Sequence, residues 1–475
     1  MAWPVRSGPV PPLAEGFIAR PETVPGLEAA LVPGAAVALV PGQEASEGRD
    51  RPGSFGKTQL ASYAAGSLWR SRTVDLLVWV VATSRASVLS GFGQAAAKLG
   101  LDHAGDAESA AARVVAWLSG ASRPWLVVLD DLCCAAALDG LWPQGPEGRL
   151  LITTADPAAV SGEPGALALP VPAFSMRETL TYLSDRLTTD PDQRSGAIDL
   201  AGELGGEPVA LAQASAVIAS SGMPCRDYRH YFVQRRAQLE AASGGKRPAT
   251  SVTWTLSAGH AEQLAPGGDT WLLLVLAALL DGHGIPGTVF TAPATCRYLL
   301  GEGAASSPDP GRAWSALLAL ERAGLLAIDA AGTPPTARMN LAVQAAVRAA
   351  APQPMLDRAV TAAADALAVR WPEDQPRSRL AADLRSCAAS LRRIAGDSLQ
   401  SGGSCHRLLL TAGQSLDSAR LAGPAVGWWR ELAAGSDRIQ PGSATGGCLG
   451  WPRLCARVFL DRPPRFRYRT AVAWS

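Results

Sequence analysis

The sequence has almost no net charge and no long apolar run. Its 43 basic residues against 42 acidic ones leave a net charge of +1, which gives no electrostatic reason to expect a nucleic acid or a membrane surface as a partner. The longest apolar run extends from Trp271 to Leu280, far short of the ~20 residues that a membrane-spanning helix needs. The first 30 residues hold no apolar block of the kind found in a secretory signal. We therefore expect neither nucleic acid nor membrane among the partners.

Cysteine and histidine are also scarce, with 8 and 5 residues in 475. The cysteines show neither the spacing of a metal site nor that of a disulfide framework, and Cys133 and Cys134 are adjacent. Reduced thiols are typical of a cytoplasmic protein, so the cytoplasm is the expected location. The histidines are isolated in the sequence and predict no metal site: His103, His230, His260, His283 and His406.

The composition is that of a globular chain, with 18% charged and 48% hydrophobic residues. In the first part of the chain, short apolar segments alternate with helical ones. The segments predicted as strands are 35–40, 74–82, 125–129, 150–154 and 167–171. Such alternation favours a parallel sheet with helices on both faces, which binds its ligands at the carboxyl ends of the strands.

A Gly-Lys-Thr turn carries the residues of a phosphate-binding loop. Gly53 and Gly56 give the backbone freedom that lets several N–H groups converge on phosphate oxygens. Lys57 supplies the positive charge for the terminal phosphates, and Thr58 supplies the hydroxyl that binds magnesium. The first glycine of the usual G-x-x-x-x-G-K-[ST] pattern falls at Arg51. We therefore expect a wider opening at the start of the loop.

Two adjacent carboxylates follow the apolar segment at 125–129. Asp130 is placed to bind magnesium, and Asp131 to orient or deprotonate the water that attacks the terminal phosphate. The alternative interpretation of this pair is a solvated acidic turn. Because the Gly-Lys-Thr turn also follows a predicted strand, both motifs are expected at the same edge of the sheet. Together they predict a site for a nucleoside triphosphate with Mg²⁺.

Six segments resemble the NB-ARC group of STAND signalling NTPases, whose bacterial members often continue into tetratricopeptide repeats. The resemblance spans residues 13–435. The segments are FIARPE (17–22), GKTQLA (56–61), VVLDDL (127–132), LLITTA (150–155), GGEPVALAQA (205–214) and RMNLAVQAAVR (338–348).

The resemblance implies a nucleotide-operated switch, in which ADP holds the module closed, exchange for ATP opens it and open modules oligomerise. It implies that Lys57 and Thr58 bind phosphate and Mg²⁺. By the same resemblance, Asp130 binds Mg²⁺ and Asp131 supports a slow ATP hydrolysis. Pro208 would pack on the adenine ring, although without the family it is an ordinary helix-start proline. A protein partner would bind through the C-terminal helices.

Two further residues depart from the family pattern. Ala155 stands where many members have an arginine that senses the terminal phosphate, and Asn340 stands where a winged-helix histidine contacts the bound diphosphate. An asparagine side chain can donate a hydrogen bond but carries no charge. We therefore expect Asn340 to face the phosphate with a weaker hold on ADP, and the protein to discriminate poorly between ATP and ADP.

The domain organisation follows from the same patterns. A capping box at 175–178 opens a helix, and a candidate hairpin at 325–341 after apolar helices is typical of a winged helix. We predict an α/β fold, with a P-loop NTPase parallel sheet followed by a helical domain, a winged helix and C-terminal helical, TPR-like repeats. The predicted parts are an N-terminal lead (1–30), a P-loop NTPase domain (31–174), a helical subdomain (175–245), a winged-helix domain (252–350), a helical region (354–440) and an irregular basic tail (441–475). The tail is either a partner-binding segment or a frameshifted end.

Two other functions stay open at this point. The first is a degenerate scaffold that holds partners through its helices without turning over nucleotide. The second is a winged-helix transcriptional regulator, although residues 252–350 contain few basic side chains and nucleic-acid modules concentrate such side chains on one face. Retention or hydrolysis of adenine nucleotide by the purified protein separates the switch from the scaffold.

Overall fold

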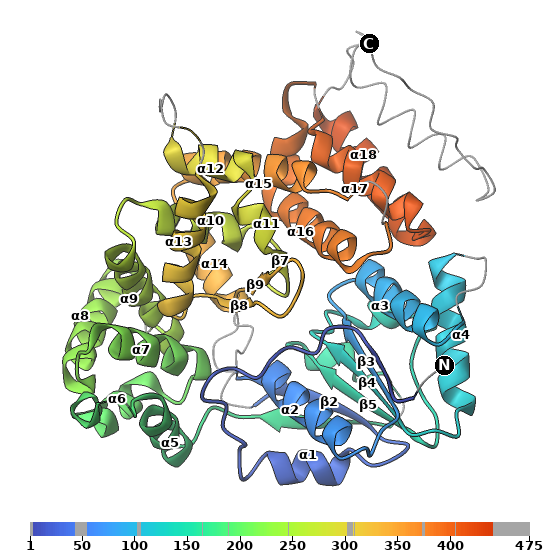
Figure 1. Ribbon diagram of the computed structural model, residues 1–475, viewed down its shortest axis with the longest axis horizontal. Coiled ribbons are helices and arrows are strands. Elements are labelled where there is room, and N and C mark those ends of the chain that lie inside the picture. The colour runs from blue at the N-terminus through green and yellow to red at the C-terminus, as the bar shows by residue number, and fades with distance from the viewer. Residues whose placement is uncertain are drawn as a thin grey trace.

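A parallel sheet, the helices that follow it and a C-terminal helical region make up the computed structural model (Figure 1). The structure describes residues 3–42, 55–101, 106–163, 165–188, 190–245, 247–301, 307, 309–372, 376–403 and 405–439. Arg51, Gly53 and the predicted tail at 441–475 lie outside the described residues. None of the described helices combines the length and the apolar character needed to cross a membrane.

Six parallel strands form the sheet, in the order β1-β3-β4-β5-β2-β6. The strands are β1 (Val5–Ser7), β2 (Ala36–Pro41), β3 (Leu76–Val81), β4 (Trp125–Asp130), β5 (Gly148–Thr153) and β6 (Ala166–Val171). Strands β2 to β5 are almost wholly apolar because helices cover both faces of the sheet. The predicted α/β fold with a parallel sheet is confirmed. The sequence pattern does not predict β1, which extends the sheet at the edge next to β3.

The two faces of the sheet are covered by different helices. Along β2, Leu39 lies in one buried cluster with Leu60 of α2, whereas the next side chain back, Ala38, lies in the opposite cluster with Phe92 of α3. This alternation follows from the two-residue repeat of a strand. The covering helices are α1 (Val24–Ala30), α2 (Lys57–Arg70), α3 (Arg85–Lys98) and α4 (Ala107–Gly120).

Five helices with a core of their own follow the sheet (Figure 1). They are α5 (Met176–Arg186), α6 (Ala197–Leu204), α7 (Pro208–Ser221), α8 (Cys225–Ser243) and α9 (Ala249–Leu264). The predicted capping box is present at the start of α5, where Ser175 and Glu178 each bond the other's backbone N–H. Among the described residues, short 3₁₀ helices lie at Ala135–Leu138, Pro157–Ala159, Pro191–Arg194 and Gly396–Gly403.

A small antiparallel sheet, in the order β7-β9-β8, lies among the next helices. Its strands are β7 (Ile285–Pro286), β8 (Ala327–Asp329) and β9 (Thr336–Arg338), and the helices are α10 (Asp269–Ala278), α11 (Gly287–Phe290), α12 (Pro293–Leu300), α13 (Pro310–Arg322) and α14 (Leu341–Ala350). Strands β8 and β9 form the predicted hairpin. The two-residue strand β7 is an addition that the sequence does not predict, and it pairs with β9.

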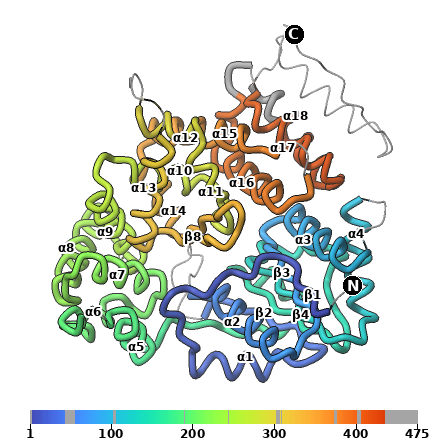
Figure 2. The backbone as a smooth tube through the Cα atoms, viewed as in Figure 1, coloured from blue at the N-terminus to red at the C-terminus, as the bar shows by residue number. Residues whose placement is uncertain are grey.

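Four helices complete the described chain, and they close it into a ring. They are α15 (Gln353–Val369), α16 (Arg379–Ala395), α17 (Arg407–Ser418) and α18 (Ala422–Ile439). Both α16 and α18 contact α3, and the backbone N–H of Ala107 at the start of α4 donates to the carbonyl of Arg420, at 3.0 Å. Figure 2 shows the C-terminal helices beside the first part of the chain.

Candidate functional site

The start of α2 carries the two central residues of the predicted phosphate loop. Gly56 is the N-cap residue of α2 and has a φ of 84°, a left-handed conformation that favours glycine. Lys57 and Thr58 occupy the first turn, where backbone N–H groups and the helix dipole favour an anion. Lys57 is buried, and burial lowers the pKa of its ammonium group, an effect that the charges of Asp131 and Asp130 oppose.

Asp130 ends strand β4 and is joined to the start of α2. Its Oδ1 atom accepts hydrogen bonds from Thr58 Oγ1 at 2.8 Å and from Thr153 Oγ1 at 2.7 Å. The strand order explains this arrangement, because β5, which ends at Thr153, lies between β4 and β2. Burial raises the pKa of Asp130, while the charge of His283 and the two hydroxyl groups act in the opposite direction.

Asp131 follows the end of β4 and has a left-handed backbone conformation. Its φ is +56°, and its N–H donates to Thr153 Oγ1 at 2.8 Å. Its carboxylate Oδ2 lies 3.2 Å from Nε2 of His283, which belongs to the segment between α10 and β7. The two adjacent aspartates therefore have different partners: Asp130 bonds hydroxyl groups of the sheet edge, and Asp131 bonds a residue from another part of the chain.

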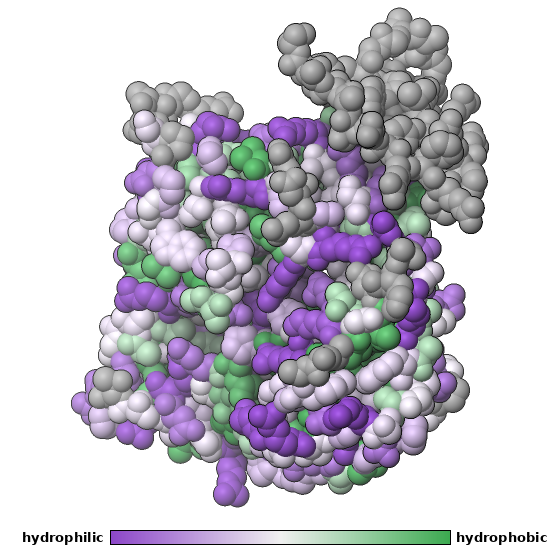
Figure 3. Space-filling model, turned by 45° about the vertical axis from the view of Figure 1, so that its right-hand side comes forward, coloured by the Kyte–Doolittle hydropathy of each residue, from purple (hydrophilic) through white to green (hydrophobic). Residues whose placement is uncertain are grey.

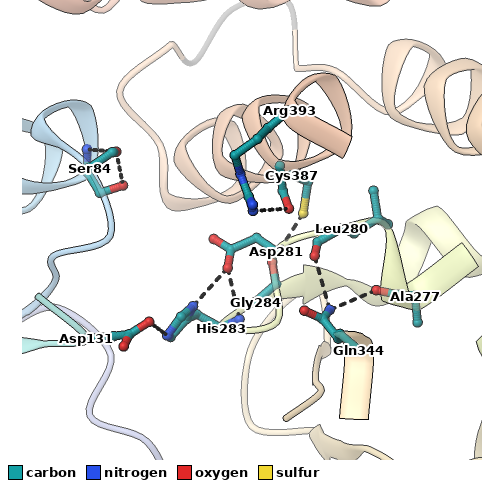
Figure 4. Close-up of polar contacts among 12 residues, drawn as sticks. Ser84, Asp131, Ala277, Leu280, Asp281, His283, Gly284, Gln344, Cys387 and Arg393 are labelled. Atoms are coloured by element: carbon teal, nitrogen blue, oxygen red, sulfur yellow. Dashed lines mark hydrogen bonds and ion pairs between the residues drawn. The ribbon is translucent and has the colours of Figure 1, made fainter. Parts of the chain in front are cut away.

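His283 joins two carboxylates, as Figure 4 shows. Its Nδ1 lies 2.9 Å from Oδ1 of Asp281, opposite the contact with Asp131. Burial acting alone would lower the pKa of His283, but the hydrogen bonds to Asp131 and Asp281 outweigh it and hold the pKa well above its usual value. A charged imidazolium between two carboxylates therefore connects the sheet domain to the β7 segment.

His283 is isolated in the sequence, and sequence reasoning missed its two contacts in the fold. Its partner Asp131 is distant in sequence, so no local spacing shows the contact. The local signal was the Asp281-Gly282-His283-Gly284 turn, in which two glycines allow close approach: a Cβ atom on Gly282 would lie 2.4 Å from the carbonyl oxygen of Met339. Among the described residues, no three or more His, Cys, Asp or Glu side chains form a cluster able to hold a metal ion.

Pro208 begins α7 at one of its first two positions, which suits a residue without an N–H. The preceding Glu207 bonds the start of α9, accepting from the N–H groups of Ala249 and Thr250 at 3.2 and 2.9 Å. Gly206 has a φ of +67°, and a Cβ atom there would lie 2.1 Å from the carbonyl oxygen of Phe174. The Gly-Glu-Pro segment is thus fixed by its own contacts, and Pro208 lines the cavity described below.

Arg20, in the FIARPE segment at 17–22, holds the end of the loop before α2. Its guanidinium donates to the carbonyl groups of Phe55 at 2.6 Å and Pro172 at 2.7 Å, and it stacks over the ring of Phe174. Burial lowers the pKa of Arg20 to about 10. This residue ties the end of the phosphate loop to the segment that leads into α5.

A central cavity of about 1510 Å³ brings the predicted residues together. Its walls come from the sheet domain, from α7, from the β7–β9 region and from α16 and α18. The predicted site residues that line it are Gly56, Lys57, Thr58, Asp130, Asp131, Pro208 and Asn340. Gly53 lies outside the described residues. Sequence reasoning missed many charged residues of the wall, among them Asp281, His283 and Arg338.

Asn340 is the N-cap residue of α14. Its Oδ1 atom accepts from the N–H groups of Ala342 and Val343 at 3.0 and 3.4 Å. This cap was readable in the sequence, because an asparagine directly before an apolar helix is a typical start signal. Asn340 also lines the cavity, which is compatible with its predicted place beside a phosphate. That role stays a prediction.

We expect Asn340→Ala to destabilise α14 by about 1 kcal/mol, because it removes the acceptor for two N–H groups of the first turn. Hydrogen exchange of the amides of 342–344 measures the loss. Asn340→Asp is the matched control, since it keeps an acceptor oxygen. Equal protection in the alanine variant and the parent would show that the cap contributes nothing.

No protein-family model matches the chain, and none of the curated proteins matches it. Among solved structures, it is similar to a STAND protein with a tetratricopeptide repeat sensor from Pyrococcus horikoshii, at 13% identity and a TM-score of 0.47, over 95% of this chain and 66% of that one. It is similar to the ORC2 protein of Aeropyrum pernix in ADPNP–ADP complexes, at 14% identity and a TM-score of 0.29, over 72% and 96%. The ORC1 protein of Aeropyrum pernix in complex with DNA is also similar, at 15% identity and a TM-score of 0.30, over 72% and 94%.

Identities of 13–15% and TM-scores of 0.29–0.47 do not place the chain in a family. The chain corresponds to only 66% of the STAND protein's length. One of the similar structures holds DNA, so the comparisons give no support to the expectation that nucleic acid is not a partner. The NB-ARC resemblance stays a prediction.

Proposed function

We propose that this protein binds ATP and ADP with Mg²⁺ and acts as a nucleotide-operated switch of the STAND type. One observation carries the proposal: the first turn of α2, with Lys57 and Thr58, is hydrogen-bonded to Asp130 at the carboxyl edge of a parallel sheet. Anionic phosphates are favoured at such a helix start, and ligands of parallel sheets bind at that edge. The cavity there has walls from every region of the chain.

The residues present fit a bound Mg²⁺ ion. Magnesium is usually held by one or two carboxylates together with substrate phosphates and waters, rather than by a complete cage of protein ligands. Asp130 and Thr58 supply a carboxylate and a hydroxyl that already lie 2.8 Å apart. When bound, the ion would neutralise charge on the terminal phosphates.

The proposed function includes a slow hydrolysis of ATP. Asp131 is the group we assign to orient or deprotonate the attacking water. In the structure its carboxylate is paired with His283, and an engaged carboxylate is a poor acceptor for a proton from water. We therefore propose a slow ATPase whose turnover is limited while this contact persists.

The remaining parts of the proposal concern the rest of the chain. Pro208 would pack on the adenine and Asn340 would lie on the phosphate side, since both line the cavity that Lys57 lines. A protein partner would bind the helices α15–α18, and the ATP form would self-associate. Figure 3 shows hydrophilic and hydrophobic residues interspersed over one face of the molecule. The free cysteines support a cytoplasmic location.

The test is direct. The purified chain is denatured and the released nucleotide identified, and ATP and ADP are then titrated into the nucleotide-free protein with and without Mg²⁺. Magnesium-dependent binding with slow release of phosphate supports the switch. Binding without any turnover favours the degenerate scaffold, and binding of neither nucleotide contradicts the proposal. A titration of double-stranded DNA into the same protein tests the winged-helix regulator.

The paired aspartates should separate binding from turnover. We expect Asp130→Asn to weaken Mg²⁺-dependent ATP binding, because an amide is a poorer ligand than a carboxylate for a hard cation. Asp131→Asn should keep binding but lower phosphate release by about 10²- to 10⁴-fold, the usual contribution of a general base. Titration and a phosphate-release assay measure the two effects. Unaltered turnover in both variants would refute this division of roles.

A further inference from the structure

Arg338 lines the central cavity at the end of β9. Its Nε atom is buried, and no group among the described residues bonds to it. Burial lowers the pKa of Arg338 from its usual value, although Asp329, Asp130 and Asp383 act in the opposite direction. A guanidinium has five N–H donors and keeps its charge, and a buried donor without an acceptor costs free energy. Nε itself is enclosed, but the side chain lines the cavity, where a ligand can bring acceptor oxygens to its terminal nitrogens.

The pairing of β7 with β9 places Arg338 beside the segment that holds His283. Ile285 lies opposite Ala337, so Arg338 is level with Gly284 and next to His283 in the ladder. His283 reaches Asp131, and Arg338 is near enough to Asp130 for their charges to interact. The guanidinium and the carboxylate assigned to Mg²⁺ thus line the same cavity.

The other arginines of the cavity wall are exposed or already engaged. Arg322 is exposed at the end of α13. The engaged ones are Arg85 with Glu108 at 2.6 Å, Arg186 with Glu15 at 2.7 Å, Arg379 with Asp383 at 3.4 Å, and Arg385 with Ser415 at 2.9 Å. The Nε atom of Arg186 is buried without a bond as well, but the terminal nitrogen of that guanidinium is paired with Glu15. On the sheet side, Ala155 offers no cation at all. Arg338 is the arginine best placed for a further phosphate contact.

We propose that Arg338 senses the terminal phosphate of ATP, in the place of the arginine that the sheet lacks at Ala155. The inference rests on the nucleotide switch proposed above and adds how that switch distinguishes its two ligands. A guanidinium binds two phosphate oxygens through parallel N–H bonds. Because ADP lacks the terminal phosphate, this contact favours ATP alone, and a ligand shifts a switch only through such differential affinity. It replaces the expectation of poor discrimination.

The experiment is an equilibrium titration of ATP and of ADP, each with Mg²⁺, into the nucleotide-free full chain. We expect Arg338→Gln to weaken ATP binding by about 10- to 100-fold, the value of a lost charged hydrogen-bonding group, with ADP binding almost unchanged. Arg338→Lys keeps the positive charge but loses the two parallel N–H donors, so its ATP affinity should lie between those of the parent and Arg338→Gln. The matched control is Arg379→Gln, which alters an engaged arginine of the same cavity and should leave the ATP-to-ADP ratio unchanged.

Two outcomes overturn the inference: ATP binding that Arg338→Gln leaves unchanged, or losses of ATP and ADP binding that are equal. Lys57→Ala in the same titration separates the two proposals. If Lys57→Ala abolishes binding while Arg338→Gln has no effect on ATP, only the sensor fails. If the parent binds neither nucleotide, the switch itself fails. Thermal unfolding of each variant without nucleotide checks its fold, and Arg338→Lys decides the ratio if Arg338→Gln does not fold.

Discussion

Lys57→Ala should abolish the retention of ATP and ADP, with a loss of affinity of about 100-fold or more. Lys57 is buried in the first turn of α2 and lies close to two carboxylates. Its charge is thus held where the terminal phosphates should lie, and each charged hydrogen bond to them contributes about 1.5–3 kcal/mol. Without it, Asp130 and Asp131 would repel the incoming phosphates. Nucleotide titration, with released nucleotide measured after denaturation, tests the change.

Lys98→Ala is the matched control for this prediction. Lys98 ends α3 and donates to the backbone carbonyl of Arg6 at 2.6 Å in an exposed position, so its removal should leave nucleotide binding unaltered. If Lys57→Ala binds nucleotide as well as the parent and Lys98→Ala do, the assignment of the phosphate loop is wrong and the proposed switch fails with it.

His283→Ala should loosen the contact between the sheet domain and the β7 segment. The imidazole lies between Asp131 and Asp281 at 3.2 and 2.9 Å, and its removal leaves two partly buried carboxylates without their shared cation. We expect a loss of about 2 kcal/mol for this contact, which corresponds to roughly 30-fold faster exchange of the amides at 282–285. Phosphate release should rise as well, because Asp131 becomes available to water.

The same contact should depend on pH. The pKa of His283 is raised in the folded protein, so the stabilisation is complete below the unfolded value of about 6.5 and is lost as pH rises through the raised pKa. Asp131 and Asp281 bond the ring, and Asp130 lies near enough for the charge of His283 to act on it. The parent and His283→Ala should therefore differ most at pH 6 and converge at high pH.

His406→Ala is the control for the histidine series. His406 also pairs with a carboxylate, Asp365, at 3.3 Å, but both residues belong to the C-terminal helices. Its removal should leave the exchange at 282–285 unaltered. Equal exchange in His283→Ala and the parent at pH 6 would show that the two regions do not depend on this histidine.

The sheet could be predicted because most of its strands show a simple pattern in the sequence. β2 to β5 are covered on both faces, so each is a continuous apolar run between polar turns. β1 shows no such pattern, since its three residues include Arg6, and β7 has only two residues. Short edge strands obtain their structure from the partner strand and not from their own composition.

The sequence predicted those residues of the candidate site that follow directly on a strand. Lys57 and Thr58 follow one strand, Asp130 and Asp131 end another, and parallel strands bring such ends together. The contacts of His283 and Arg338 depend on how the β7–β9 pair meets the sheet domain, which no sequence spacing records. Asn340 was interpreted by resemblance, although its local position before an apolar helix already predicted the cap found here.

The hydrogen bond between Ala107 and Arg420 closes the chain into a ring, so its domains are not arranged as a linear series. In a linear series, each domain moves on its own. In a closed ring, a movement of one domain must be compensated by a movement of another, so the cavity is held from two sides. If α17 and α18 move away from α4, the bond between Ala107 and Arg420 is lost, and the His283–Asp131 contact stays as a link between the sheet domain and the β7 segment. In the proposed switch, a partner bound to the C-terminal helices and a nucleotide bound beside Lys57 would thus act on the same closed ring.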